Sequence, residues 1–244
     1  MPEVVHAAVQ TEPVRIHQQS SRRLAEEVAR CKEALETHPM ARLASEGAIP
    51  ESILREYARI QYVDSVLWIP MLALIKGKTK SPRLMKAVRA NILCEAGYDG
   101  KPHVTMAKEF VESLGEPTYY GDYSEYAPRA AHPVEVMNGL AGMTEAEMSG
   151  WLLAAETLVP IFFSIFRPAF AQIHGADLRY LDEHISVDAD EHSQWMSEAV
   201  QEILSQDEDN FEQILNGIRI GGRVTLSIPD VLYARTIRTC RINA

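Results

Sequence analysis

Apolar residues recur at spacings of three and four along most of the chain, which is typical of amphipathic α-helices. Stretches that alternate apolar and polar residues, the pattern of a β-strand, are nearly absent. We therefore expect an all-α protein, a bundle of about seven or eight helices that forms a single domain over residues 1–244. The pattern predicts helices near 18–46 (broken at His38-Pro39), 50–76, 82–97, 101–115, 133–173, 174–206 and 208–238, after a loose lead-in at 1–17.

Prolines mark several predicted boundaries. Pro50 and Pro82 fit the first turn of a helix, and Ser81 fits the cap before the second of them. Pro160 and Pro168 fall inside a long helical pattern and should kink that helix. Residues 116–133, rich in tyrosines and turn residues, predict a loop packed over the bundle.

Composition and charge exclude several classes of protein. The chain has 244 residues, 46% of them hydrophobic, which is enough for one substantial core. A formal charge of −10 without a dense Lys/Arg run argues against nucleic acid or an anionic membrane as partner. No window is continuously apolar over the roughly 18 residues of a membrane span, and no secretory signal is seen. Cys31, Cys94 and Cys240 are widely spaced, so we expect a reducing, cytoplasmic location.

The stretch 181–203 places polar groups on an apolar helical face. At about 100° per residue, Asp188 and His192 fall near the middle of this face and His184 toward its edge. An acid and an imidazole directed at the core need a specific reason. The apolar residues of the same face are Leu181, Ile185, Met196, Ala199 and Ile203.

Two further acids show the same pattern on other helices. Glu156 shares a face with Leu152 and Phe163, and Glu95 falls in line with Leu84 and Val88. Three carboxylates and at least two imidazoles therefore point into the core. An isolated buried carboxylate is costly, so each must be paired, protonated or bound to a metal.

For any one of these residues a structural explanation is the commoner one. A lone His on an apolar face is usually a hydrogen-bonded core residue, and a single buried Glu more often has an Arg or Tyr partner. The combination, however, favours a di-iron or di-manganese site, which helical bundles build from carboxylates and imidazoles on facing helices. Mixed oxygen and nitrogen ligands suit iron or manganese, and the lack of clustered cysteines disfavours structural zinc. The repeated Glu-x-x-His pair of ferritin-like proteins is not found here.

Three stretches carry a resemblance to a known family. They are THPMARLASEGAIPESILREYARIQYVDSVLWIPMLA, LCEAGYDGKPHVTMAKEFVESLG and HISVD, together with Glu156. Over approximately residues 30–206 the chain resembles the haem-oxygenase-like di-iron oxidases and oxygenases. The motif of that family is a Glu, a His after a short turn, a second Glu, and His-x3-Asp followed by a His. The resemblance implies the metal ligands Glu95, His103, Glu156, His184, Asp188 and His192, with the three carboxylates also catalytic.

The chain departs from the family motif at two points. In many members the last His follows the Asp by three residues, a position that Glu191 occupies here. Helical phase places His192 closer to the core face, although a local π-bulge would reverse this choice. The gap between Glu95 and His103 is also slightly longer than usual, across a turn that can absorb an insertion.

The resemblance implies an O2-activating enzyme with about two Fe(II) per chain, Mn being the alternative metal. The implied substrate is a small molecule, an amino acid, amine or fatty acid, which undergoes N-oxygenation, desaturation or oxidative C–C cleavage. We also expect a homodimer. Candidate pocket residues are Tyr57, Tyr62, Asp64 and Trp68, each of which is equally compatible with core packing.

Two other functions remain open. One is a metal-free enzyme resembling thiaminase II, which uses a nucleophilic Cys, or pyrroloquinoline-quinone synthase, with His and Glu as general acid and base. The other is a non-catalytic helical binding protein with a degenerate site. Metal analysis after anaerobic Fe(II) loading would discriminate among the three.

Overall fold

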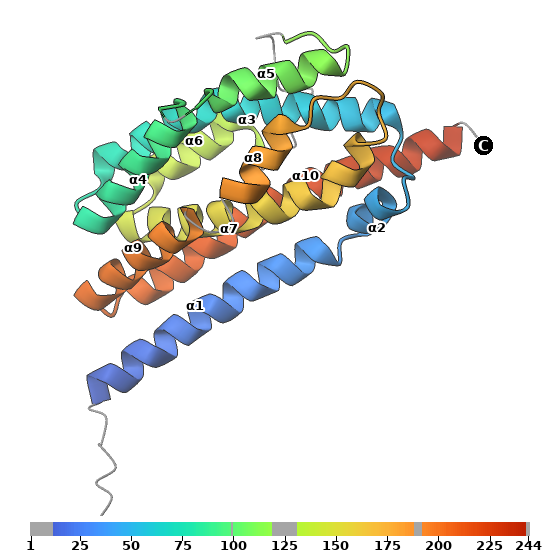
Figure 1. Ribbon diagram of the computed structural model, residues 1–244. Coiled ribbons are helices and arrows are strands. Elements are labelled where there is room, and N and C mark those ends of the chain that lie inside the picture. The colour runs from blue at the N-terminus through green and yellow to red at the C-terminus, as the bar shows by residue number, and fades with distance from the viewer. Residues whose placement is uncertain (1–11, 99, 119–130, 188–191, 243–244) are drawn as a thin grey trace, which may run out of the picture.

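The computed structural model describes residues 12–98, 100–118, 131–187 and 192–242. These ranges contain ten α-helices and no β-strand (Figure 1), which confirms the all-α prediction and exceeds the predicted seven or eight helices. The helices are α1 (Glu12–Glu36), α2 (Pro39–Ser45), α3 (Glu51–Lys78), α4 (Pro82–Glu95), α5 (His103–Ser113), α6 (Pro133–Gly142), α7 (Glu145–Phe170), α8 (Arg179–Val187), α9 (Ser193–Gln206) and α10 (Asn210–Ile242).

The predicted helix 133–173 is wrong as a single element, because the chain breaks between α6 and α7. Thr144 starts α7 with a capping box: its Oγ1 accepts from the Glu147 backbone N–H at 3.2 Å, and the Glu147 carboxylate accepts from the Thr144 N–H at 2.9 Å. Such reciprocal bonds satisfy N–H groups that a helix start leaves unpaired. The apolar rhythm continues across the break and hides it, whereas the TEAE motif marks it.

Other predicted boundaries need smaller corrections. The predicted helix 174–206 appears as α8 and α9, and residues 188–191 between them lie outside the described part of the chain. The predicted lead-in at 1–17 is too long, because α1 already begins at Glu12. The break at His38-Pro39 is confirmed, as is the Ser81 cap, whose Oγ accepts from the Leu84 N–H at 3.1 Å. α7 continues through both Pro160 and Pro168.

The long helices α7 and α10 run side by side in direct backbone contact (Figure 1). Two glycines make this possible: a Cβ on Gly150 would overlap the carbonyl of Ile214, and one on Gly217 would overlap the carbonyl of Glu147. The contact fixes the distance between the two helices more tightly than interdigitating side chains would. α7 and α10 thus form a rigid base for the bundle.

The expectation that no window could span a membrane needs correction. By length and composition alone, α3 and α7 each contain an 18-residue window apolar enough to cross a membrane. Core helices of globular proteins pass the same test, and 67% of the α7 window is buried inside the bundle. Tyr57 of α3 stacks on Phe166 of α7, with ring centroids 4.4 Å apart, so these apolar faces pack on each other. Core packing accounts for the composition of α7, whereas 44% of the α3 window is buried.

Candidate metal centre

A tight turn brings Glu95 and His103 together. α4 ends at Glu95 and α5 begins at His103. Gly97 has a φ of +75°, and a Cβ at that position would overlap the backbone of Pro102, so the turn requires glycine. The chain reverses within these few residues, and Glu95 Oε2 lies 3.1 Å from His103 Nδ1.

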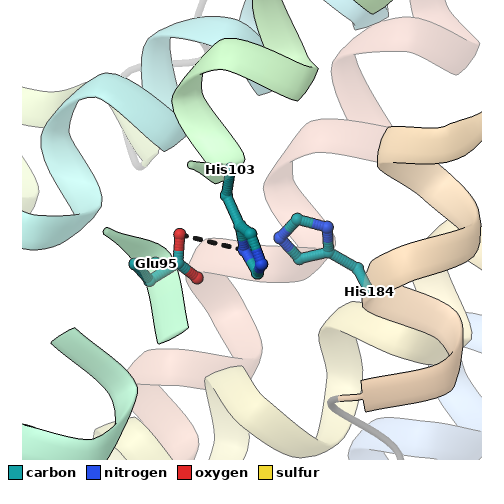
Figure 2. Close-up of side chains that lie close together, drawn as sticks. All are labelled: Glu95, His103 and His184. Carbon is teal, nitrogen blue, oxygen red and sulfur yellow. Dashed lines mark ion pairs between the residues drawn. The ribbon is translucent and has the colours of Figure 1, made fainter. Parts of the chain in front are cut away.

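His184 reaches the same point from α8, which packs against both α5 and α7. Figure 2 shows its ring beside that of His103, with Glu95 on the other side of His103. The two ring centroids are 4.6 Å apart. One potential ligand atom from each of Glu95, His103 and His184 lies within 4.8 Å of the others, and all three side chains are at most 6% exposed. Such an arrangement can hold a metal ion.

A backbone contact orients His184 for ligation. Its Nδ1 lies 2.8 Å from the carbonyl oxygen of Tyr180, one helical turn earlier. Since a carbonyl can only accept, Nδ1 carries the proton and Nε2 keeps its lone pair. Burial, together with the charge of His103, lowers the pKa of His184 to about 3. The imidazole is therefore neutral, as a metal ligand must be.

His103 carries a proton that a metal would displace. Burial favours its neutral form, but the Cys94 thiol and the Glu95 carboxylate outweigh this effect and raise the pKa of His103 to about 10. Despite the short distance to Glu95, its buried Nδ1 is not aligned for a hydrogen bond with any described residue. The protonated His103 ring and the Glu95 carboxylate thus form a buried ion pair that is poorly aligned as a hydrogen bond, and a metal ion could take the place of the proton between them.

Glu156 and His192 form a second buried pair. His192 Nδ1 donates to Glu156 Oε2 at 3.2 Å, and Asn91 of α4 donates from Nδ2 to Glu156 Oε1 at 2.5 Å. Each carboxylate oxygen retains a further lone pair, so the hydrogen bonds orient Glu156 without using up its capacity as a ligand. The bond between Asn91 and Glu156 links α4 to α7.

Cys94 lies between the two groups. Its Sγ is 4.0 Å from His103 Nε2, and hydrogen bonding to His103 and His192 lowers the pKa of the thiol. Through Cys94, the pair Glu156–His192 adjoins the group of Glu95, His103 and His184. Five of the six residues that the family resemblance implied are therefore buried in one region of the bundle.

The sixth, Asp188, lies outside the described residues, as does Glu191. The choice between Glu191 and His192 as last ligand therefore stays a prediction. His192 itself is 1% exposed and lies in a π-helical turn just before α9. A local π-bulge is the feature that would favour Glu191 over His192 as last ligand, but residues 188–191, on which this depends, lie outside the described residues.

A cavity of about 120 Å³ opens next to the candidate ligands. Glu95, Glu156 and His184 contribute to its wall, and α3 contributes Asp64 and Trp68, two of the four predicted pocket residues. The other two, Tyr57 and Tyr62, are buried but do not line it. Most of the other residues in the wall are apolar. The described wall as a whole contains three carboxylates, Asp64, Glu95 and Glu156, and no Lys or Arg. The cavity thus brings three carboxyl groups close to the neutral imidazole of His184.

Periodicity missed two parts of this region. Asn91 was not predicted, although it lies one helical turn before Glu95 on the same apolar face, which is the signal that would have identified it. The residues that α10 contributes to the cavity wall were also missed, because an apolar or small residue carries no chemical signature. They are Gly221, Val224, Thr225 and Ile228.

The donor set fits iron. Carboxylate oxygens and neutral imidazole nitrogens on facing helices are the ligands of non-haem iron in bundles, and none of the described ligand candidates except the adjoining Cys94 is a thiol. No curated protein matches the chain. The family described as iron-containing redox enzyme matches residues 55–224, a range that includes Glu95, His103, Glu156, His184 and His192. The protein therefore belongs to the family of iron-containing redox enzymes.

Proposed function

We propose that the protein is an O2-activating, non-haem di-iron oxidase or oxygenase that acts on a small molecule. The observation that carries this proposal is the buried group of Glu95, His103 and His184, whose potential ligand atoms lie within 4.8 Å of one another. The family match supports iron and redox chemistry; the number of metal ions and the use of O2 are our proposal.

Charge balance supports more than one cation. Glu95 and Glu156 both line the cavity, and the described part of its wall contains no Lys or Arg to offset them. Burying two carboxylates is costly even when neutral groups hydrogen-bond to them, and bound metal would offset this cost. Glu156 and His192 would extend the ligand set beyond the first group, and we include Asp188 from the family resemblance. When bound, reduced iron would supply the electrons that O2 activation needs.

The described residues prepare the site for this chemistry. The Tyr180 carbonyl holds the proton of His184 on Nδ1, which directs Nε2 toward Glu95 and His103. Asn91 fixes the orientation of Glu156 through a hydrogen bond to Oε1. Phe162, Phe163 and other apolar residues of the cavity wall restrict water around the substrate, which limits side reactions.

One contact favours a second candidate function, a metal-free enzyme of the thiaminase type. Cys94 lies 4.0 Å from His103 Nε2, as a nucleophile lies near its base. Against this reading, Cys94 is not among the residues that line the described cavity, and a thiol mechanism gives no role to Glu156 or His184. We therefore rank the thiaminase-like function below the di-iron function.

Metal analysis after anaerobic loading tests the proposal. The full-length protein, reduced and incubated with Fe(II), should retain about two iron ions per chain after desalting. Glu95→Ala and Glu156→Ala should each lose at least one of them, whereas Glu208→Ala, an exposed surface change, should lose none. Retention of no iron by the wild-type protein would refute a di-iron enzyme.

A cysteine variant separates the two candidate functions. Cys94→Ser should keep the iron content and any O2 consumption, because Ser preserves the size of the side chain and removes only the nucleophilic sulfur. Iron-free protein whose activity depends entirely on Cys94 would support the thiaminase-like alternative instead.

A further inference from the structure

Asp64 is a carboxylate in the cavity wall that the proposed metal chemistry does not use. It lies on α3, separate from the group of Glu95, His103 and His184. α3 directs one face into the cavity at spacings of three and four residues. The residues of that face are Gln61, Asp64, Ser65, Trp68 and Met71.

The Asp64 carboxylate has no hydrogen-bond or ion-pair partner among the described residues, although burial and, to a smaller extent, the charge of Asp64 raise the pKa of the Tyr57 hydroxyl. Its neighbour Ser65 is not available, because its hydroxyl is bonded to the Tyr180 hydroxyl at 2.7 Å. Burial raises the pKa of Asp64 to about 7, and no nearby charge or hydrogen bond counteracts this. A half-buried acid left in this state is strained electrostatically, and a bound cation would relieve it.

The rest of the wall suits a molecule with an apolar body. Trp68 and Trp151 both line the cavity, with ring centroids 5.7 Å apart, and Phe162 adds a third ring. Aromatic faces bind hydrocarbon and also attract cations. Glu95 and Glu156 line the same cavity, so an anionic ligand would meet three acids and no described positive side chain.

We propose that Asp64 recognises the positively charged group, a primary ammonium or a guanidinium, of a substrate whose apolar part lies against the tryptophans. This inference rests on the proposed function and narrows its substrate class: amines and basic amino acids are favoured, and fatty acids are disfavoured. Asp64 would act in binding and positioning, and it would not hold metal.

Three probes of equal chain length test the inference directly. The full chain, with Mn(II) bound in place of iron, is titrated with n-hexylamine, hexanoate and n-hexanol at about pH 8, where Asp64 is ionised and the amine protonated. Binding is followed by tryptophan fluorescence, since Trp68 and Trp151 line the cavity, and by calorimetry. We expect n-hexylamine to bind at least about tenfold more tightly than either other probe.

Two matched variants test whether the Asp64 carboxylate is the group that binds the amine. Asp64→Asn keeps the shape of the side chain and should weaken n-hexylamine binding at least about tenfold while the metal content stays unchanged. Asp209→Asn makes the same change on an exposed loop and should have no effect. Equal affinity of wild-type protein and Asp64→Asn for the amine, or tighter binding of hexanoate, would overturn the inference, as would loss of metal from Asp64→Asn. If that variant does not fold, the comparison of amine with carboxylate in the wild-type protein still decides.

The outcomes separate this inference from the proposed function. Full metal loading without selective amine binding would overturn the role of Asp64 and leave the metal centre standing. Asp64-dependent amine binding by a protein that retains no metal would support the role of Asp64 and refute the di-iron enzyme.

Discussion

Asn91 on α4 donates a hydrogen bond of 2.5 Å to Oε1 of Glu156 on α7. Both side chains are at most 4% exposed, and the side-chain oxygen Oδ1 of Asn91 has no hydrogen-bond partner in the described part of the chain. The cost of this half-satisfied amide indicates that its role is to hold Glu156. Asn91 thus fixes the position of an acid that belongs to the candidate metal centre, 65 residues away in the sequence.

Replacing Asn91 with Leu should weaken metal binding without removing a ligand. The change keeps the approximate volume and deletes the donor, so Glu156 would lose its fixed orientation. We expect metal affinity, measured by competition with a chelator, to fall roughly 10- to 100-fold, as for other residues that orient ligands. Asn216 makes a similar bond of 2.9 Å to Glu147 on the surface, so Asn216→Leu serves as the control and should keep wild-type affinity. Equal affinities for the two variants would show that Asn91 has no positioning role.

Removing metal should loosen α8 more than the rest of the bundle. His184 joins α8 to Glu95 and His103, and a metal held by all three would tie these helices together. At free metal about 100 times Kd, binding should add about 2.7 kcal/mol of stability, or roughly 5–10 °C in Tm for a chain of this size. Hydrogen exchange should show slower exchange in α8 on loading and little change in α1. Uniform protection of both helices, or none, would contradict a metal link at His184.

Asp64 should make the stability of the metal-free protein depend on pH. Its folded-state pKa of about 7 exceeds the ordinary value of 3.8, so folding favours the protonated acid. Its contribution therefore becomes less favourable as pH rises from about 4 to 7, and then levels off. The titratable groups that share its cavity are Glu95, Glu156, Tyr180 and His184.

Asp64→Asn removes this dependence. Relative to the wild-type protein, its free energy of unfolding should be roughly 1–4 kcal/mol higher at about pH 8 and nearly equal at about pH 4. Urea unfolding of both proteins at the two pH values measures the difference. A difference that does not change with pH would mean that Asp64 is not buried as a neutral acid.

The sequence predicted helix ends best where a capping residue or a first-turn proline occurs at the end of the helix. Ser81 and Pro82 start α4 as expected, because a hydroxyl cap and a ring without an N–H suit that position. The break before Glu145 was missed, because apolar spacing reports only which face is buried. A rhythm of that kind can continue unchanged across a bend.

The residues of the candidate site also differ in how well the sequence predicted them. Helical phase placed Glu95, Glu156 and His184 in the core, since each lies inside a regular helix. It could not place His103, whose position depends on the turn at Gly97; only the family resemblance suggested it. The missing partner of Asp64 was also beyond prediction, because pairing depends on which side chains from distant helices meet.

Gly217→Ala should test the backbone contact between α7 and α10. A single methyl group would overlap the Glu147 carbonyl, so the helices must separate and the packing around them must shift. We expect a loss of about 1–3 kcal/mol in the free energy of unfolding. Gly77→Ala is the matched control, because no atom lies within 4 Å of its Cβ position, and it should be neutral or stabilising by up to about 1 kcal/mol. Equal stabilities would show that the helices can separate freely.

The contact at Gly150 and Gly217 also has a consequence for how enzymes of this kind diversify. Further along α10, Val224, Thr225 and Ile228 face the cavity beyond the glycine contact. Because the glycines hold the two helix backbones in register, exchanges at those three positions would reshape the wall without displacing Glu156 on α7. Substitutions on α10 alone would therefore change the shape of the cavity, while the wall that carries Glu156 would be inherited unchanged.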